Sequence, residues 1–261
     1  NVDAANPNYR GENGMLLNKA GTTLLAYPSA RGAVTLATVT AIDIAAFYGC
    51  TSLTTVSLPA TLTSIGSYAF ASCPNLTAIN VDAANPNYKG ENGMLLNKAG
   101  TTLLAYPSAR GVVILATVTA IDIAAFYSCK SLTEVSLPAA TSIGEHAFDN
   151  CTSLTEVSLP AATSIGEQAF HHTGETALTV TLGSTVPTLG IRLFHEVYPA
   201  KTVTVKVPSG AAAWSGKTGT FSGTNATVNW GNSFRGGGWD GSAFVSGGEV
   251  NSYITLTVKY Q

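Results

Sequence analysis

A short motif recurs along this chain at an almost constant interval, and this repeat limits the folds that the chain can adopt. Phe47 and Phe70 are 23 residues apart, and Phe126, Phe148 and Phe170 follow one another at intervals of 22. A fixed period of this size is typical of stacked-repeat proteins, in which each unit buries its apolar side only against its neighbours. The period therefore predicts a solenoid.

A longer duplication is superimposed on the short repeat. Asn1–Cys50 aligns with Asn80–Cys129 and differs at four positions, which are Arg10/Lys89, Ala33/Val112, Thr35/Ile114 and Gly49/Ser128. Each copy contains two apolar runs around a loop with glycine, which predicts β-hairpin insertions near residues 9–32 and 88–111. Because the first residues already match the inside of the longer unit, we expect further residues, including any export signal, upstream of Asn1.

Each short repeat contains one clear strand signal. In the segment 55–58, Val56 and Leu58 alternate with Thr55 and Ser57, which predicts a half-buried strand. On the other side of the coil, the segment 67–71 is predicted to form a short helical or 3₁₀ turn. Stacking the coils places each strand beside its predecessor in a parallel sheet. We therefore predict a solenoid over residues 1–208.

The composition changes beyond residue 208. The segment 209–261 holds all three tryptophans and a run of glycines, and it ends in an alternating strand pattern at 253–260. The last coil of a solenoid needs a cover that hides its apolar face from water. This segment is therefore predicted to be a β-rich C-terminal cap.

The repeat also resembles a known family. Its pattern is I-G-x-x-A-F-x-x-C-x-x-L-x-x-V-x-L-P, carried by Ile143, Gly144, Ala147, Phe148, Cys151, Leu154, Val157, Leu159 and Pro160. This pattern resembles the leucine-rich repeat of the BspA-like (Treponema-type) bacterial surface proteins, from which Thr173 departs where a cysteine is expected. The resemblance implies a leucine-rich-repeat solenoid that is secreted or anchored at the cell surface of host-associated bacteria. For some members it implies binding to host matrix proteins or to other cells.

Charge and motif content argue against several classes of function. Only 11% of residues are charged and the net charge is −2, which disfavours binding to nucleic acid or to an anionic membrane surface. No apolar run reaches the roughly 18 residues of a membrane span. The sequence has no nucleophile elbow, no phosphate-binding loop and no recurrent Ser-His-Asp order. We therefore predict a non-enzymatic protein without a cofactor.

The four cysteines stand three residues after a repeat phenylalanine, at Cys50, Cys73, Cys129 and Cys151. Stacked coils at about 5 Å would satisfy the Cα separation of a disulfide for Cys50–Cys73 or Cys129–Cys151. A parallel ladder, however, keeps the Cβ atoms further apart than a disulfide requires. We therefore predict free, buried thiols that pack as small apolar groups.

Two sets of polar residues are candidates for metal binding, and both have a simpler interpretation. The four histidines are His146, His171, His172 and His195, which we interpret as solvated turn residues rather than as a zinc or acid–base site. Oxygen-bearing side chains gather at Asp3, Asn6, Asn8, Glu12 and Asn13, and again at Asp82, Asn85, Asn87, Glu91 and Asn92. Such oxygens suit calcium, but Asn and Asp are also ordinary turn residues. The sequence therefore predicts no metal site.

The outward-facing strand positions are the best candidates for partner binding. They are predicted to form columns across the sheet at Thr55, Ser57, Asn80, Glu134, Ser136, Glu156, Ser158, Thr179 and Thr181. They make either a solubilising surface or a broad, weakly acidic binding face, and stacked Glu134 and Glu156 would repel each other. Three functions remain open: an adhesin that binds a host or cell-surface protein, a carbohydrate-binding module, and a passive envelope spacer. The aromatic residues Trp230, Phe234, Trp239 and Tyr253 are either a glycan platform or the core of the cap.

Overall fold

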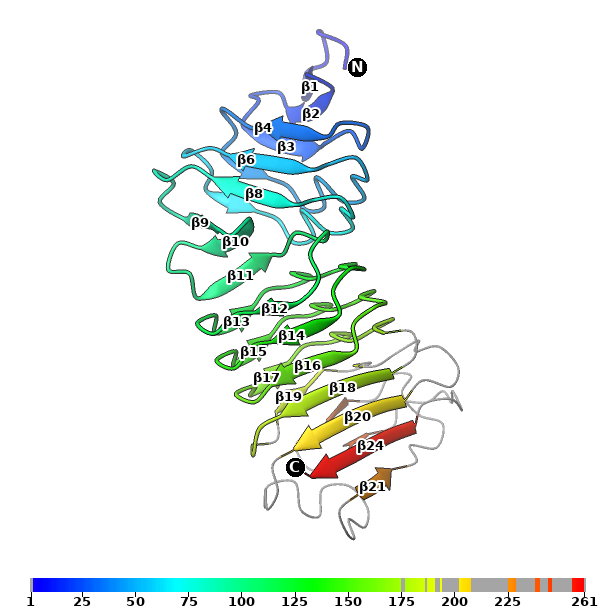
Figure 1. The fold of residues 1–261 in the computed structure, drawn as a ribbon. Helices are drawn as coiled ribbons and strands as arrows, with labels where there is room; N and C mark the ends of the chain where they lie inside the picture. Colours follow the sequence, from blue (N-terminus) through cyan, green and yellow to red (C-terminus); the bar gives the residue numbers. More distant parts are fainter. Residues whose placement is uncertain are drawn as a thin grey trace.

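The described part of the chain forms a β-solenoid whose coils stack in one column (Figure 1). The computed structural model describes residues 2–174, 177–185, 187–190 and 193. It also describes the strands β20 (Thr202–Val207), β21 (Asn225–Val228), β22 (Gly238–Trp239), β23 (Phe244–Val245) and β24 (Thr255–Tyr260).

One side of the solenoid is built from the longer strand of each coil. In the first unit, β4 (Ala33–Thr35), β6 (Thr55–Leu58) and β8 (Ala78–Val81) pair in parallel as the N-terminal long-strand sheet. From the second unit onward, the strands form the C-terminal long-strand sheet, which begins with β12 (Val113–Ile114), β14 (Glu134–Ser136), β16 (Glu156–Leu159) and β18 (Ala177–Leu182). It continues through β20 and β24, which pair in parallel, and β21 joins β24 antiparallel.

On the opposite side, the coils that follow each insertion carry strands of only two residues. In the first unit, β5 (Ala41–Ile42) pairs in parallel with β7 (Ser64–Ile65). From the second unit onward, the same positions form β13 (Ala120–Ile121), β15 (Ser142–Ile143), β17 (Ser164–Ile165) and β19 (Thr188–Leu189). These strands hold the coils together on the side where the sequence pattern gave no strand signal.

The expected helical or 3₁₀ turn in each coil is wrong, because the described residues contain no helix. The segment 67–71 instead forms a series of turns, in which Ala71 N donates to Tyr68 O at 3.0 Å. Tyr68 and Ser72 have φ angles of 61° and 56°, which lie in the left-handed region and interrupt a right-handed helix. Other amide groups bond to the next coil, as Phe148 N does to Ala169 O at 2.9 Å. Pairing between coils therefore replaces pairing within a helix.

Each longer unit begins with three antiparallel strands. They are β1 (Tyr9–Glu12), β2 (Met15–Asn18) and β3 (Thr23–Ala26) in the first unit, and β9 (Tyr88–Glu91), β10 (Met94–Asn97) and β11 (Thr102–Ala105) in the second. Gly21 and Gly100 lie in the turn before the third strand with φ angles of 74°, a conformation that favours glycine. The third strand then joins the short strands in parallel, β3 to β5 and β11 to β13.

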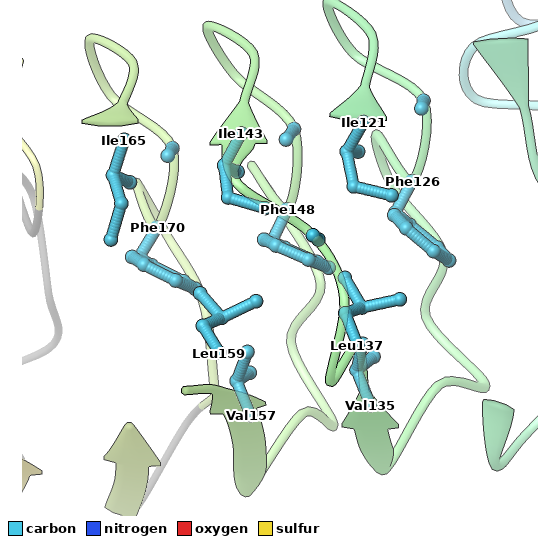
Figure 2. Packing of buried hydrophobic residues seen from close by; sticks show 14 of the residues in the cluster. Ile121, Phe126, Val135, Leu137, Ile143, Phe148, Val157, Leu159, Ile165 and Phe170 are labelled. Atoms are coloured by element: carbon cyan, nitrogen blue, oxygen red, sulfur yellow. The ribbon is translucent and has the colours of Figure 1, made fainter. Parts of the chain in front are cut away.

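The core is a repeating set of inward side chains. Figure 2 shows the isoleucine, phenylalanine, leucine and valine of successive coils lying in matching rows. Phe148 is fully buried, and its ring stacks on Phe126 and Phe170 with centroid distances of 5.0 and 5.3 Å. Tyr27 and Tyr106 extend the two ring columns at their N-terminal ends, each 5.0 Å from the following phenylalanine. The repeat phenylalanines are therefore packing residues.

The motif glycine is required because adjacent coils approach closely at this point. A Cβ atom on Gly144 would lie 2.6 Å from the carbonyl carbon of Asp122. At Gly66 the corresponding distance is 2.4 Å to the amide nitrogen of Ile44. These contacts are with backbone atoms, which cannot move aside as a flexible side chain would.

The cysteine of each coil binds the backbone of the coil before it. The thiols of Cys73 and Cys151 donate to Phe47 O at 3.0 Å and to Phe126 O at 2.9 Å. Thr173, which departs from the motif, places its hydroxyl 2.8 Å from Phe148 O and therefore makes the same hydrogen bond. The coil that contains Phe170 keeps this interaction although it lacks the cysteine.

Replacing Thr173 with valine is expected to lower the free energy of unfolding by about 1 kcal/mol, the net value of one hydrogen bond. Phe148 O would keep its second donor, Cys151 N at 3.2 Å, which limits the loss. Thr173→Cys restores the residue found in the other coils and should cost less. Chemical denaturation followed by circular dichroism measures both changes, and an equal loss in the two variants would contradict the shared hydrogen bond.

All four cysteines lie in the core with free thiols. Burial raises the pKa of Cys50 to about 11 and that of Cys73 to about 12. Because the neutral thiol is favoured in the fold, its contribution to stability is complete below the ordinary pKa of 9.0 and is lost as the pH rises toward about 12.

We therefore expect Ellman's reagent to react with none of the thiols in the folded chain and with four after unfolding in guanidinium without reductant. Fewer than four reactive thiols in the unfolded chain would show that disulfides form. Rapid reaction in the folded chain would instead show that the thiols are accessible.

The predicted boundary at residue 208 and the predicted cap remain predictions. Trp230, Phe234 and Tyr253 lie outside the described residues, and only the strand position of Trp239 in β22 is described. The residue His195 also lies outside the described residues.

Candidate functional site

The predicted outward columns lie in register within each long-strand sheet. Ser57 pairs with Asn80 in the first unit, with Thr55 beside Ala78. In the second unit the two columns are Glu134–Glu156–Thr179 and Ser136–Ser158–Thr181. All these side chains are exposed or half-buried, whereas the alternating valines are buried. The structure therefore places the predicted residues on one outer face of each sheet.

The two sheets do not form one continuous face, contrary to the expected columns. The N-terminal long-strand sheet ends at β8, and the C-terminal long-strand sheet begins at β12. The second insertion lies against β8, where Ile79 N donates to Gly93 O at 2.8 Å. Asn80 and Ser136 are therefore separated by the insertion, which the alternation pattern of single strands does not reveal.

An exposed apolar pair stands at the first strand of the C-terminal long-strand sheet. Val112 is 59% exposed and Ile114 is 67% exposed. Ile114 pairs with Ser136 and so begins one of the predicted columns. The two side chains border a groove of about 460 Å³ that Glu91 and Arg110 also line.

The sequence itself marks these two residues, although they are not among the predicted outward positions. They are two of the four differences between the duplicated segments, and they replace Ala33 and Thr35. Ala33 and Thr35 are exposed at the same outward positions of β4. The second copy has therefore exchanged a small and a polar residue for two larger apolar ones on an exposed face.

A second hollow lies at the junction between the two units. Tyr106 is followed by Pro107, and this coil lacks the I-G-x-x-A-F turn that other coils place on the same edge. A cavity of about 260 Å³ is found there, lined by Tyr68, Tyr88 and Tyr127 among others.

The tyrosines of this hollow form a cluster across the junction. The rings of Tyr68 and Tyr127 meet edge to face with centroids 5.5 Å apart, and Tyr48 lies 6.2 Å from Tyr127. Tyr48 is 49% exposed. Burial raises the pKa of Tyr68 to about 12, so its hydroxyl stays protonated at neutral pH. The cluster is an aromatic surface, and its residues are not those of the predicted tryptophan platform.

The oxygen-rich loops use several of their oxygens for turns. Asp3 Oδ1 accepts from Ala5 N at 2.8 Å, and Asn6 Oδ1 accepts from Asn8 N at 2.9 Å. Asn85 Oδ1 accepts from Asn87 N at 2.8 Å, while its Nδ2 donates to Pro59 O at 2.8 Å. These contacts agree with the interpretation of the loops as turns.

Two of the described histidines, His146 and His171, depart from the expectation of solvated turn residues. His146 and His171 are half-buried, and both contact the buried carboxylate of Asp149, at 2.8 and 2.9 Å.

In the part of the chain that the structure describes, no helix is long and apolar enough to cross a membrane.

The repeat that builds the solenoid also matches a known protein family. The family model described as "BspA type Leucine rich repeat region" matches residues 29–92 and 105–224 with 6 copies. A leucine rich cell surface protein from Faecalibacterium prausnitzii is 28% identical, with a TM-score of 0.52 over 67% of this chain and 49% of that chain. A search of curated proteins returned no significant match.

Two further solved structures are similar but more distant. The pneumococcal vaccine antigen PcpA is 17% identical, with a TM-score of 0.48 over 69% of this chain and 63% of that chain. The T. pallidum leucine rich repeat protein is 24% identical, with a TM-score of 0.38 over 71% of this chain and 83% of that chain. This chain spans less than two thirds of PcpA and about half of the F. prausnitzii protein. Because the family model matches more than half of its residues, the chain belongs to the BspA-type leucine-rich repeat family.

Proposed function

We propose that this protein is a non-enzymatic interaction protein of the bacterial cell surface that binds a host matrix or cell-surface protein. The family match and the similarity to a protein named as a leucine rich cell surface protein support an extracellular or surface-anchored location. The partner binds the outer face of the C-terminal long-strand sheet, with the antiparallel strands near residues 88–111 as hairpin edges of the same surface. Repeat proteins generally present extended surfaces of this kind to their partners.

The exposed apolar pair Val112 and Ile114 is the observation that supports this proposal most directly. Full burial of an apolar side chain of this size contributes about 1.5–3 kcal/mol of favourable free energy. Most of this free energy is not realised for these two side chains in the unbound chain, because they are exposed. Polar side chains surround them, since Ser136, Ser158 and Glu134 occupy the following outward positions. An apolar centre with a polar rim is typical of protein interfaces. Glu134 pairs directly with Glu156, a repulsion that does not serve stability.

The duplicated segment supplies the matched variants for a test. The double variant Val112→Ala with Ile114→Thr gives the second copy the residues that the first copy already folds with. We expect it to bind immobilised, purified host matrix proteins at least about tenfold more weakly than the unchanged chain, which corresponds to about 1.4 kcal/mol. Surface plasmon resonance against a panel of such proteins measures the loss.

The reciprocal double variant, Ala33→Val with Thr35→Ile, is the control in the first unit and should leave binding unchanged. Both variants should unfold within about 0.5 kcal/mol of the unchanged chain, as is usual for exposed positions. If the unchanged chain binds no matrix or cell-surface protein, or if the Val112/Ile114 variant binds equally well, the proposed face is wrong.

A second candidate function is carbohydrate binding at the tyrosine cluster. The observation that favours it is the cavity of about 260 Å³ with Tyr68 and Tyr127 on its wall and the exposed Tyr48 beside it. Sugar rings pack on aromatic faces, and tyrosine hydroxyls form hydrogen bonds at such sites. A glycan array decides between the two functions, because Tyr48→Ala should then abolish glycan binding and leave protein binding intact. A chain that binds neither class of ligand would be a spacer in the envelope.

A further inference from the structure

Three histidines of this chain meet one buried aspartate at a single corner of the solenoid. Asp149 is only 4% exposed, and both of its carboxylate oxygens contact imidazole rings. His146 Nδ1 lies 2.8 Å from Asp149 Oδ2, and His171 Nδ1 lies 2.9 Å from Asp149 Oδ1. The ring centroid of His172 lies 4.0 Å from that of His171. The corner therefore concentrates a carboxylate and three imidazoles around one point.

The backbone of the two coils holds this corner in position. Asp149 and His171 both follow directly after a repeat phenylalanine, and they are one period of 22 residues apart. Asn150 N donates to His171 O at 2.9 Å, and His146 N donates to Glu167 O at 2.9 Å. The register of the solenoid thus presents these side chains to each other, so a ligand would meet a largely prearranged site.

We propose that Asp149, His171 and His172 bind one divalent transition-metal ion, with Zn²⁺ as the best match. One carboxylate oxygen and one nitrogen from each imidazole all lie within 4.8 Å of one another. Ligands at about 2.0–2.2 Å from a zinc ion are separated from each other by roughly 3–3.5 Å, so small side-chain rotations complete the site. The His171 Nδ1 to Asp149 Oδ1 distance of 2.9 Å is already close to that separation.

The chemistry of the ligand set selects the type of ion. Two imidazole nitrogens and one carboxylate oxygen suit Zn²⁺, Ni²⁺ or Cu²⁺. Ca²⁺ takes six to eight oxygen ligands and Mg²⁺ binds mainly through oxygen, so this set suits neither ion. A buried carboxylate also needs compensating positive charge, which a divalent cation supplies. Three protein ligands leave a position on the ion for water or for a donor atom of a bound molecule.

His146 has a different role in this site, that of a positioning residue. Its Nδ1 contacts Asp149 Oδ2, the oxygen that is not shared with His171. Contacts of this type fix the orientation of a ligating carboxylate and typically change metal affinity by about 10–100-fold when removed. When the ion binds at His171 Nδ1, any proton that this atom shares with Asp149 Oδ1 is released to the solvent. The proposal is independent of the proposed partner-binding face.

The site is tested by isothermal titration calorimetry. The whole chain is first stripped of metal with EDTA and is then titrated with Zn²⁺. We expect saturable binding of one ion, loss of that binding in His172→Gln and in Asp149→Asn, and an affinity lowered by about 10–100-fold in His146→Gln. His195→Gln, which changes the fourth histidine, and Glu156→Gln, which changes an exposed carboxylate, are the matched controls and should bind as the unchanged chain does. Co²⁺ should give visible absorption bands that disappear in His172→Gln.

The proposal is overturned if the unchanged chain shows no saturable Zn²⁺ binding, or if binding survives in both His171→Gln and His172→Gln. Circular dichroism of each variant in EDTA establishes that it is folded. If Asp149→Asn does not fold, His172→Gln decides the question, because His172 is half-buried at a surface turn and its replacement leaves the Asp149 contacts with His146 and His171 in place.

Discussion

Phe148→Ala is expected to lower the free energy of unfolding by about 3–5 kcal/mol, the range found for large buried aromatic residues. The Phe148 ring is fully buried between Phe126 and Phe170, and it lies nearly parallel to the Phe170 ring, with an interplanar angle of 3°. Truncation removes its own burial and leaves a cavity that both neighbouring rings border. The rigid backbone pairing between coils prevents the solenoid from collapsing into that cavity.

Guanidinium denaturation followed by far-ultraviolet circular dichroism measures this loss. Ile44→Ala is the control, because Ile44 is 66% exposed and its truncation should change stability by no more than about 0.5 kcal/mol. A loss below about 1 kcal/mol in Phe148→Ala would show that the ring column does not stabilise the coils.

Gly144→Ala should lower the free energy of unfolding by about 3 kcal/mol, at the upper end of the usual cost of overpacking. The new Cβ would lie 2.6 Å from the carbonyl carbon of Asp122 and 2.7 Å from the amide nitrogen of Ile123. Relief requires the two coils to separate, which lengthens their backbone hydrogen bonds, among them Gly144 N to Ile121 O at 2.9 Å. One methyl group is thus expected to disturb the stacking of a whole coil.

Gly111→Ala provides the matched control, since the nearest atom to its added Cβ is Ser131 O at 3.5 Å, an ordinary contact. This variant should be unchanged or more stable by about 0.4–1 kcal/mol, because alanine restricts the unfolded chain. Thermal and guanidinium denaturation measure the free energy of unfolding of each variant. The two values should change in opposite directions, or differ from each other by at least about 2 kcal/mol. Equal stability of both variants would contradict the close approach of the coils.

Much of the fold follows from the sequence, because local pattern and repeat period act together. The alternation of Val56 and Leu58 with Thr55 and Ser57 predicts a strand with one buried face, and the structure has β6 at this position. The spacing of the phenylalanines predicts their stacking, since residues one period apart occupy equivalent places in adjacent coils. The outward columns within each sheet follow from the same register.

Other features depend on contacts between coils that no local pattern encodes. The segment 67–71 is not helical, because Tyr68 and Ser72 adopt left-handed backbone conformations and the amides bond to the next coil. The insertion separates Asn80 from Ser136, because its strands lie against β8 rather than outside the stack. The tyrosine hollow exists because one coil lacks the turn that its neighbours carry.

The candidate sites show the same division. The duplication marks Val112 and Ile114 in the sequence, but only the structure shows that both are exposed beside a groove. Asp149 and His171 are 22 residues apart, which is too far for the short ligand pairs by which local metal motifs are recognised. They meet at 2.9 Å because one period along the chain equals one step between coils. The sequence by itself thus determined the repeat, the longer strands and the buried side chains of each coil, whereas the stacking of coils decided where the short strands form and which polar side chains come together.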